Sequence, residues 1–262
     1  DTNQMMGLTD ASVKVIPSDG YGNPDIIRRI IDSEKPDAII HFTDPRYWIW
    51  LYQMENEIRQ KIPMVFYTIW DDVPYPMYNR EFYRSDDMHL CISRQTENVV
   101  KNVLKDFPKE DWAVKYVPHG INEKVFFPVV NDFEFEAFKE DLLGKEEQDF
   151  IVLWNSRNIR RKNASDIILA WRLFLDQLPE EKAKKCTLVM HTDPIDNNGT
   201  DLPRVIETFC DPAKHKVIFT GQKYDEKHLN YLYNCSDAHM FMTDNEGWGL
   251  GLTESLTAGR MI

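Results

Sequence analysis

Long apolar runs are missing from this chain. Nowhere do its 262 residues approach the roughly 18 consecutive apolar residues of a membrane-spanning helix, and the N-terminus lacks the basic-then-apolar pattern of a secretory signal. Cysteine is scarce as well, and the four cysteines are scattered without a C-x-x-C pair, which indicates neither a disulfide framework nor a metal site. We therefore expect reduced thiols in a soluble, cytoplasmic protein without a transmembrane segment. Peripheral membrane contact and oligomeric state stay open.

Positive charge is also in short supply. The chain has 31 lysines and arginines against 43 acidic residues, which gives a formal net charge of −12. This balance argues against nucleic acid or an anionic membrane surface as the main partner. Any phosphate-binding site must then be a local cluster of cations. The share of hydrophobic residues, 42%, is that of an ordinary globular protein, and the chain is long enough for two domains.

Apolar runs of strand length recur along the chain, and segments with helical spacing lie between them. The runs are 38–42, 64–69, 88–92, 114–117, 150–154, 187–191, 216–220 and 238–242. Parallel strands that are buried on both faces have this composition, and their alternation with helices predicts an α/β protein with parallel sheets. A charged stretch without a strand, residues 128–148, reads as a linker with an exposed helix. We predict two doubly wound domains, residues 1–127 and 128–262, that face a cleft.

The most informative segment lies near the C-terminus, where Glu246 and Glu254 bound the run E-G-W-G-L-G-L-T-E. Glycines at alternate positions let a backbone approach a ligand closely, because no Cβ intervenes. The residues after Gly251 predict the opening of a helix, whose unpaired N–H groups favour an anion such as phosphate. A neighbouring carboxylate accepts hydrogen bonds from sugar hydroxyls, so the segment indicates a nucleotide sugar. A plain strand-to-helix turn is the alternative.

Four cations follow the predicted strand at 150–154. Arg157, Arg160, Arg161 and Lys162 fall within six positions at the C-terminal end of that strand, the edge where parallel α/β sheets bind ligands. Arginine offers a planar fork to phosphate oxygens and lysine a point charge, and together they can neutralise a diphosphate leaving group. The loop therefore predicts an anion site, with a solvated basic turn as the alternative.

Five short segments follow one another from residue 118 onward. They are P-H-G-I-N at 118–122, R-x-x-x-x-K at 157–162, V-I-F-T-G at 217–221, S-D-A at 236–238 and E-G-W-G-L-G-L-T-E at 246–254. In this order they resemble the retaining GT-B glycosyltransferases of the glycogen synthase and sucrose synthase-like group, glycosyltransferase family four. Ser156 and Asn163 replace the two glycines of the family's G-R-x-x-x-x-K-G element. The resemblance implies the GT-B fold, with an acceptor-side domain followed by a donor-binding domain.

The resemblance also implies a role for each matched residue. Glu246 would contact hydroxyls of the donor sugar and Glu254 the ribose, while Arg157 and Lys162 would hold the diphosphate. The rest of the donor site would be Trp248, Gly249, Leu250, Gly251 and Thr253. The implied reaction moves a hexose from a nucleotide diphosphate sugar, UDP- or GDP-hexose, to a sugar, lipid or protein acceptor. It would keep the anomeric configuration and use neither a metal nor a cofactor.

The predicted first domain departs from that family. Trp70 stands where the family commonly has an acceptor-side histidine, and Asp71 or Asp72 would offer polar contacts to an acceptor or simply cap a helix. His41 matches a frequent family histidine, with a packed core histidine as the alternative. Aromatic residues would stack on a sugar acceptor or serve only in packing. They are Tyr47, Trp48, Trp50, Tyr52, Tyr75, Tyr78, Phe82 and Tyr83.

Two other functions stay open. One is a sugar-nucleotide epimerase or hydrolase on the same fold, and the other is a catalytically inactive domain that binds a nucleotide sugar. The family's glycine-rich N-terminal loop is not found here, and Met261 and Ile262 read as the beginning of a further strand. We therefore expect a fragment that lacks an initial βαβ portion and the closing helices. The sequence names neither the base, the sugar nor the acceptor.

Overall fold

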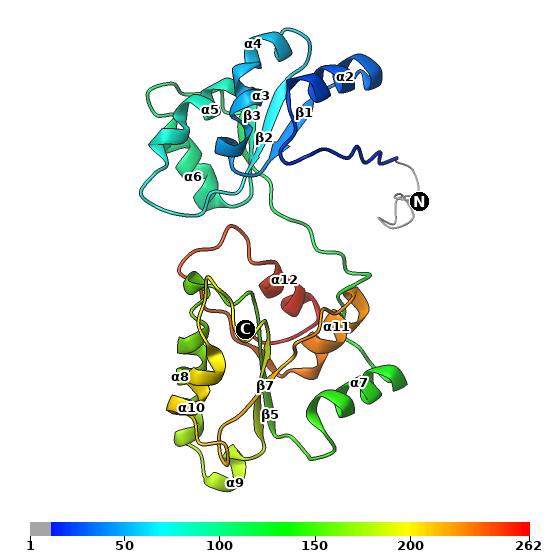
Figure 1. The fold of residues 1–262 in the computed structure, drawn as a ribbon, viewed down its shortest axis with the longest axis vertical. Helices are drawn as coiled ribbons and strands as arrows, with labels where there is room; N and C mark the ends of the chain where they lie inside the picture. Colours follow the sequence, from blue (N-terminus) through cyan, green and yellow to red (C-terminus); the bar gives the residue numbers. More distant parts are fainter. Residues whose placement is uncertain (1–11) are drawn as a thin grey trace. The chain divides into compact units, whose positions relative to one another are not determined.

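Two four-stranded parallel sheets organise the chain, of which the computed structural model describes residues 12–262 (Figure 1). One sheet lies in a unit that ends at Pro118, and the other lies in a unit that begins at His119. Helices connect the successive strands in both units. The predicted class, α/β with two Rossmann-like parallel-sheet domains, is therefore confirmed.

In the first unit the strand order is β1-β2-β3-β4, and neighbouring strands pair in parallel. The strands are β1 (Ile39–Phe42), β2 (Met64–Thr68), β3 (Met88–Cys91) and β4 (Val114–Tyr116). The helical segments are α2 (Pro24–Glu34), η1 (Pro45–Trp48), α3 (Ile49–Gln53), α4 (Glu55–Ile58), η2 (Met77–Asn79), α5 (Arg80–Ser85) and α6 (Arg94–Val103). Each pair of consecutive strands is thus joined by helical chain, as parallel pairing requires.

Helix α6 shows how local sequence fixes this arrangement. The hydroxyl of Ser93 accepts a hydrogen bond of 3.0 Å from the backbone N–H of Thr96, which satisfies a donor that the helix itself leaves unpaired. Val99 and Val103 are buried one turn apart on the same helix face. They belong to the same core cluster as Phe66 of β2. Apolar residues at helical spacing therefore bind α6 to the sheet.

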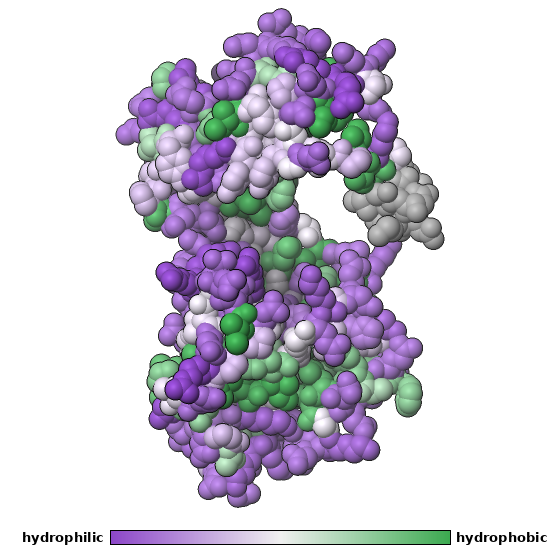
Figure 2. All heavy atoms as spheres, in the orientation of Figure 1, coloured by the Kyte–Doolittle hydropathy of each residue, from purple (hydrophilic) through white to green (hydrophobic). Residues whose placement is uncertain are grey.

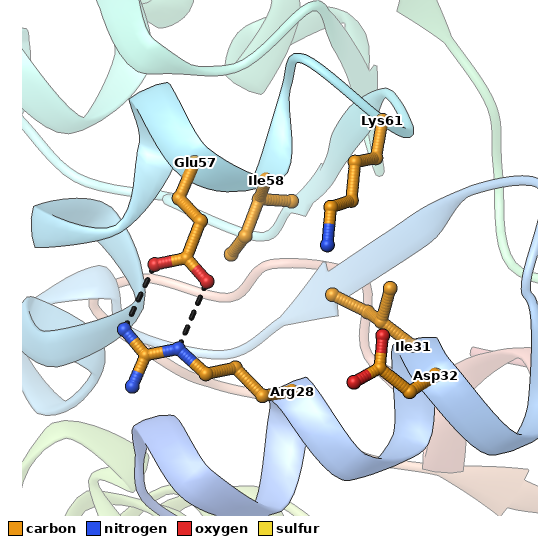
Figure 3. Close-up of a pocket in the computed structure, with 6 residues that line it drawn as sticks. All are labelled: Arg28, Ile31, Asp32, Glu57, Ile58 and Lys61. Atoms are coloured by element: carbon orange, nitrogen blue, oxygen red, sulfur yellow. Dashed lines mark hydrogen bonds and ion pairs between the residues drawn. The ribbon is translucent and has the colours of Figure 1, made fainter.

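An ion pair on the surface of the first unit joins α2 to α4. Arg28 donates two hydrogen bonds of 2.8 Å to Glu57, as Figure 3 shows. The small pocket around them is also lined by Ile31, Asp32, Ile58 and Lys61. Because both charged side chains are exposed to water, the pair adds little to stability. Ile58, which is 1% exposed, anchors α4 in the core instead.

In the second unit the strand order is β7-β6-β5-β8, again entirely parallel. The strands are β5 (Phe150–Asn155), β6 (Cys186–His191), β7 (Lys216–Phe219) and β8 (Ala238–His239). The helical segments are α7 (Phe133–Leu143), η3 (Arg160–Lys162), α8 (Ala164–Asp176), α9 (Glu180–Ala183), α10 (Leu202–Phe209), α11 (Glu226–Cys235) and α12 (Leu250–Thr257). The central strand β5 carries the loop with the four cations.

Strand β5 is buried on both faces, which makes this sheet doubly wound. Val152 and Trp154 pack in one core cluster with Trp171 of α8. Leu153, whose side chain points to the opposite face, packs in another cluster with Leu232 of α11. The continuous apolar run of β5 therefore follows from helices on both sides.

The two units divide after Pro118, whereas the sequence predicted a division after Phe127. The difference has a physical reason, because the segment that follows Pro118 packs on the second unit. Phe126 is 8% exposed and lies in one core cluster with Tyr233. The backbone N–H of Phe127 donates to the side chain of Asn230 over 3.2 Å. Residues 119–127 thus belong structurally with the sheet of β5.

The eighth predicted strand is shorter than expected. The structure has a strand only at Ala238–His239, where the prediction ran to residue 242, because the chain turns into a loop that approaches η3. Met261 forms a parallel bridge with Ala238. An apolar groove beside β8 is lined by Phe150, Val152, Trp171, Phe174, Ala238, His239, Met240 and Ile262. Figure 2 shows a broad hydrophobic area over the second unit.

Two features of the composition can be placed in the structure. Within residues 12–262, none of the helices is both long enough and apolar enough to cross a bilayer.

The four cysteines are buried and form no disulfide with one another. Burial raises the pKa of the Cys235 thiol to about 12, which keeps it protonated.

Candidate functional site

The cation loop leaves the carboxyl end of β5 and enters α8 through Asn163. This residue has a φ of +51°, in the left-handed region that glycine favours and asparagine tolerates. Its side-chain amide donates to Asp244 over 2.8 Å. Asparagine therefore keeps the backbone shape that a glycine would give at this position, and it adds a contact to the loop after β8.

Lys162 and Glu246 meet between these two loops. Lys162 is 8% exposed, and its ammonium group donates to the carboxylate of Glu246. The same ammonium group lies 5.3 Å from the ring centre of Phe241. A lysine this deeply buried needs a partner, because an unpaired buried charge is costly. Glu246 provides that partner.

Arg161 is a second cation on the same carboxylate. Its Nη1 atom lies 3.4 Å from an oxygen of Glu246 and donates to the backbone carbonyl of Asn245 over 2.6 Å. Its own carbonyl accepts the N–H of Asp244 over 2.9 Å. Two cations therefore converge on one carboxylate, which leaves a net positive charge available to an anion.

Arg157 pairs with a different carboxylate, that of Asp196. Its guanidinium group forms two hydrogen bonds to Asp196 in the loop after β6, over 2.8 and 3.3 Å, and its side chain is 64% exposed. The Arg157 guanidinium lowers the pKa of the Asp196 carboxyl. The structure thus brings Lys162 and Glu246 together as neighbours, with Arg161 rather than Arg157 beside them.

Asn158 fastens the cation loop to the loop after β6. Its side chain is buried, donates to the carbonyls of Thr200 and Pro194 over 2.7 and 3.2 Å, and accepts the N–H of Thr200 over 3.2 Å. Gly199 makes the close approach possible, since a Cβ there would lie 2.0 Å from the Asn158 carbonyl oxygen. Two adjacent loops at the carboxyl edge of the sheet are therefore held in one geometry.

Helix α12 begins at the same edge. Gly249 stands at its N-cap with a φ of +84°, and a Cβ at this position would lie 3.2 Å from the Phe241 ring. Among residues 12–262 no side chain caps this helix start. The N–H groups of Leu252 and Thr253 donate to the Gly249 carbonyl over 3.0 and 3.2 Å, so an anion would meet the N–H groups that precede them. Thr253, by contrast, donates its hydroxyl to the carbonyl of Leu250 over 2.9 Å. The backbone of the helix start is better placed for an anion than the Thr253 hydroxyl.

Two more predicted residues lie around this helix. The buried indole nitrogen of Trp248 has no hydrogen-bond partner among residues 12–262, and its ring meets His119 edge to face at 6.2 Å. Gly251 packs closely on Tyr233, because a Cβ there would lie 3.3 Å from the phenol oxygen. A larger residue at this position would push α12 away from β5.

Glu254 ends a short chain of hydrogen bonds that starts on β5. The side-chain amide of Asn155 donates to the phenol oxygen of Tyr233 over 2.7 Å, and this phenol donates to Glu254 over 2.6 Å. Burial raises the pKa of Glu254, and the hydrogen bond from Tyr233 partly opposes that effect. The carboxylate is therefore fixed in direction by its neighbours while its second oxygen can accept from a ligand.

The predicted residues of the first unit have structural partners. His41 is 4% exposed, stacks on Phe66 at 4.8 Å and shares a hydrogen bond of 3.1 Å with the Tyr52 hydroxyl. Burial lowers its pKa to about 4, so the ring is neutral at pH 7. His41 is placed as a core histidine, which is the alternative that the sequence left open.

Trp70, Asp71 and Asp72 form a turn after β2. The indole N–H of Trp70 donates to the carbonyl of Asp72 over 2.9 Å, and the Asp72 carboxylate accepts the N–H of Val73 over 2.7 Å. Gln95 at the start of α6 donates to the carbonyl of Asp71 over 2.8 Å. The turn is thus held in place by its own side chains and by α6. Across residues 12–262, no cluster of three or more His, Cys, Asp or Glu side chains is arranged to hold a metal ion.

The chain has matches among solved structures. No protein-family model and no curated protein matches it. A glycosyltransferase from Rickettsia africae ESF-5 superposes with a TM-score of 0.69 at 15% identity, over 99% of this chain and 66% of its own. An α,α-trehalose-phosphate synthase (UDP-forming) from Burkholderia vietnamiensis gives 0.63 at 11% identity, over 89% and 56%. A trehalose-6-phosphate structure from E. coli bound with UDP-2-fluoro glucose gives 0.61 at 14% identity, over 89% and 58%.

The chain has the GT-B fold. At these identities the likeness shows the fold alone, and the chain spans 56% and 58% of the length of the two trehalose-related structures. Within this GT-B fold the predicted cation loop and glutamate pair lie at one sheet edge, after β5 and β8.

Sequence reasoning missed four residues that shape the edge. The sequence does not distinguish Arg161 from the other cations of the loop, and it predicts no role for Asn158 in the same loop. Asn155 and Tyr233 lie 78 positions apart, although Tyr233 falls in a segment that resembles the glycosyltransferase family. The available signal was the three asparagines at 155, 158 and 163, a residue type whose side chain often bonds backbone groups in loops.

Proposed function

We propose that the chain is part of a retaining glycosyltransferase that moves a hexose from a UDP- or GDP-hexose to a sugar, lipid or protein acceptor. The first unit would bind the acceptor and the second the donor. One observation carries the proposal, namely the convergence of Lys162 and Arg161 on Glu246 beside the start of α12. The GT-B fold supports it, and so does the similar E. coli structure that is bound with UDP-2-fluoro glucose.

The diphosphate of the donor would lie between the cations and α12. When the bond from the anomeric carbon to the phosphate oxygen breaks, negative charge develops on the diphosphate. Lys162 and Arg161 would stabilise this charge, and the N–H groups at the start of α12 that precede Leu252 would add to this stabilisation. Arg157 would join them only by leaving Asp196. No metal is required in this scheme, because the cations and the helix end supply the positive charge.

The two glutamates would serve different parts of the donor. Glu246 accepts from Lys162 and Arg161 in the structure described, and in the complex it would accept hydrogen bonds from hydroxyls of the hexose. Glu254, directed by Tyr233, would accept from the ribose. The acceptor oxygen would then attack the anomeric carbon on the face that the diphosphate leaves. Its proton would pass to the departing phosphate oxygen, so that the configuration is retained.

Titration of the protein with UDP and with GDP tests the donor site. Lys162→Ala should weaken binding of the preferred nucleotide at least tenfold, and Arg161→Ala should weaken it more than Arg157→Ala does. Lys184→Ala, a change at an exposed lysine beside α9, serves as the matched control. EDTA should change none of these affinities. Equal affinity of wild type and Lys162→Ala would remove the basis of the proposal, and binding without transfer to any acceptor would favour the inactive binding domain.

A further inference from the structure

The carboxyl edge of the first sheet carries an exposed aromatic surface. We define it by Tyr21, Tyr47, Trp70 and Tyr78, which surround Arg46. Tyr21 and Tyr47 stack with ring centres 4.8 Å apart and an angle of 9°, although they are 48% and 57% exposed. Tyr78 is 58% exposed and meets Trp70 edge to face at 5.9 Å. Aromatic rings that contact one another while three of them stay about half exposed offer a binding face rather than a core.

Arg46 links the two halves of the aromatic surface. Its guanidinium carbon lies 5.2 Å from the ring centre of Tyr78 and 6.0 Å from that of Trp70. Asp44 holds the guanidinium through hydrogen bonds to Nε of 2.9 and 3.1 Å and an ion pair to Nη2. The Arg46 guanidinium lowers the pKa of the Asp44 carboxyl, so the pair stays charged at neutral pH. The positive charge of Arg46 is therefore already matched.

The aromatic surface occupies the edge at which parallel α/β sheets bind ligands. Arg46 and Tyr47 lie in η1 directly after β1, and Trp70 follows the neighbouring strand β2. The hydroxyl of Thr96 in α6 donates to the Trp70 carbonyl over 2.8 Å. Three successive strand-to-helix connections thus hold the surface in one shape.

The charges and the aromatic rings of the surface together indicate which ligand it binds. The segments 44–47 and 70–72 bring one arginine and three aspartates, so the surface does not favour a phosphorylated or otherwise anionic ligand. The C–H face of a pyranose ring is apolar and slightly positive, and it packs on the negative face of an aromatic ring. Hydroxyl groups at the rim of the sugar can donate to carboxylates. We propose that the aromatic surface binds a neutral saccharide. Its identification as the acceptor rests on the proposed function.

Direct binding measurements test the site without turnover. Wild-type protein is titrated with maltose, cellobiose and lactose, and with glucose 6-phosphate as the anionic comparison, by saturation-transfer NMR and calorimetry. At least one neutral disaccharide should bind, and glucose 6-phosphate should bind more weakly than it does. Tyr47→Ala and Tyr78→Ala should each weaken that binding at least fivefold. Both side chains are exposed, so the thermal unfolding temperature should stay near that of the wild type.

Trp112→Ala is the matched control, because Trp112 is 61% exposed and precedes β4, at the other edge of the same sheet. It should leave disaccharide binding unchanged. The inference is overturned if no neutral disaccharide binds, if both tyrosine variants bind as wild type does, or if glucose 6-phosphate binds more tightly. Binding of phosphatidylcholine vesicles that depends on Tyr78, without disaccharide binding, would assign the surface to lipid instead and would also overturn it.

Titration of the same samples with UDP and GDP separates this inference from the proposed function. If the protein binds a nucleotide but no disaccharide, the result supports the proposed donor site and refutes the saccharide site. If the protein binds a disaccharide through Tyr47 and Tyr78 but binds neither nucleotide, the result supports the saccharide site and refutes the proposed function.

Discussion

The ammonium group of Lys162 donates to the carboxylate of Glu246, a residue 84 positions further along the chain. The two side chains come from loops that follow β5 and β8, which are neighbouring parallel strands. Each side chain is the other's ion-pair partner. A donor diphosphate would take over Lys162 and release Glu246 toward the sugar. The pair therefore links phosphate binding to the position of the carboxylate in the proposed reaction.

Glu254→Gln should separate ribose binding from phosphate binding. The amide keeps the size of the side chain but loses the negative charge that strengthens hydrogen bonds from ribose hydroxyls. We expect the preferred nucleotide, UDP or GDP, to bind about tenfold more weakly, a change of about 1.4 kcal/mol. Calorimetry with pyrophosphate, which has no ribose, is the control and should show equal affinities. A matched loss for both ligands would contradict the ribose role.

The affinity for the preferred nucleotide sugar, a UDP- or GDP-hexose, should depend on pH through Glu254. Burial raises the pKa of this carboxyl in the folded protein, so its charged form is lost at a higher pH than in the unfolded chain. Lowering the pH through that raised pKa should protonate Glu254 and weaken binding. The same raised pKa means that Glu254 favours the folded state less as the pH rises from the unfolded pKa through the folded one. Calorimetry between pH 8 and pH 5 should show a decline in wild type that Glu254→Gln lacks, and parallel curves would contradict the assignment.

Much of the fold could be predicted from sequence, because buried parallel strands leave uninterrupted apolar runs such as 150–154 and 187–191. The limits of β8 could not, since the turn after His239 depends on contacts with the cation loop far away in the sequence. The same holds for the division after Pro118, which depends on the packing of Phe126 against Tyr233. Local patterns do not contain such long-range contacts.

The candidate site could be predicted only in part, because some of its contacts also join residues that are far apart in the sequence. Lys162 and Glu246 fall in recognisable segments, and the structure makes them neighbours. Arg161 was not singled out, because only the turn of η3 decides which cation faces Glu246. His41 had two interpretations in the sequence, and its 4% exposure places it in the core. Burial and hydrogen-bond partners are properties of the folded chain.

Asn158→Ala should loosen the cation loop and destabilise the second unit. The change removes a buried side chain that satisfies three backbone groups of Pro194 and Thr200, and unpaired buried groups cost about 1–3 kcal/mol. Urea unfolding should show a loss of this size. Asn198→Ala, at an exposed asparagine of the facing loop, should stay within about 0.5 kcal/mol of wild type. Equal stability of the two variants would refute the role given to Asn158.

Gly249→Ala should disturb the start of α12. Alanine would have to adopt the φ of +84°, which is strained for a residue with a Cβ, and its Cβ would crowd the Phe241 ring. Together these effects cost of the order of 1–3 kcal/mol. Thermal unfolding should report the loss, and UDP binding should fall because the first N–H groups of α12 shift. Gly120→Ala is the control, since a Cβ there meets no atom within 4 Å. A Gly249→Ala protein with wild-type stability would argue against the strained turn.

The most direct test of the proposed donor site is a crystal structure of the protein with UDP or GDP. We expect the diphosphate against Lys162 and the start of α12, in contact with Arg161 or Arg157, and the ribose on Glu254. Glu246 should then have moved away from Lys162. Nucleotide density at any other place, or a diphosphate that leaves the ion pair of Lys162 and Glu246 intact, would contradict the account.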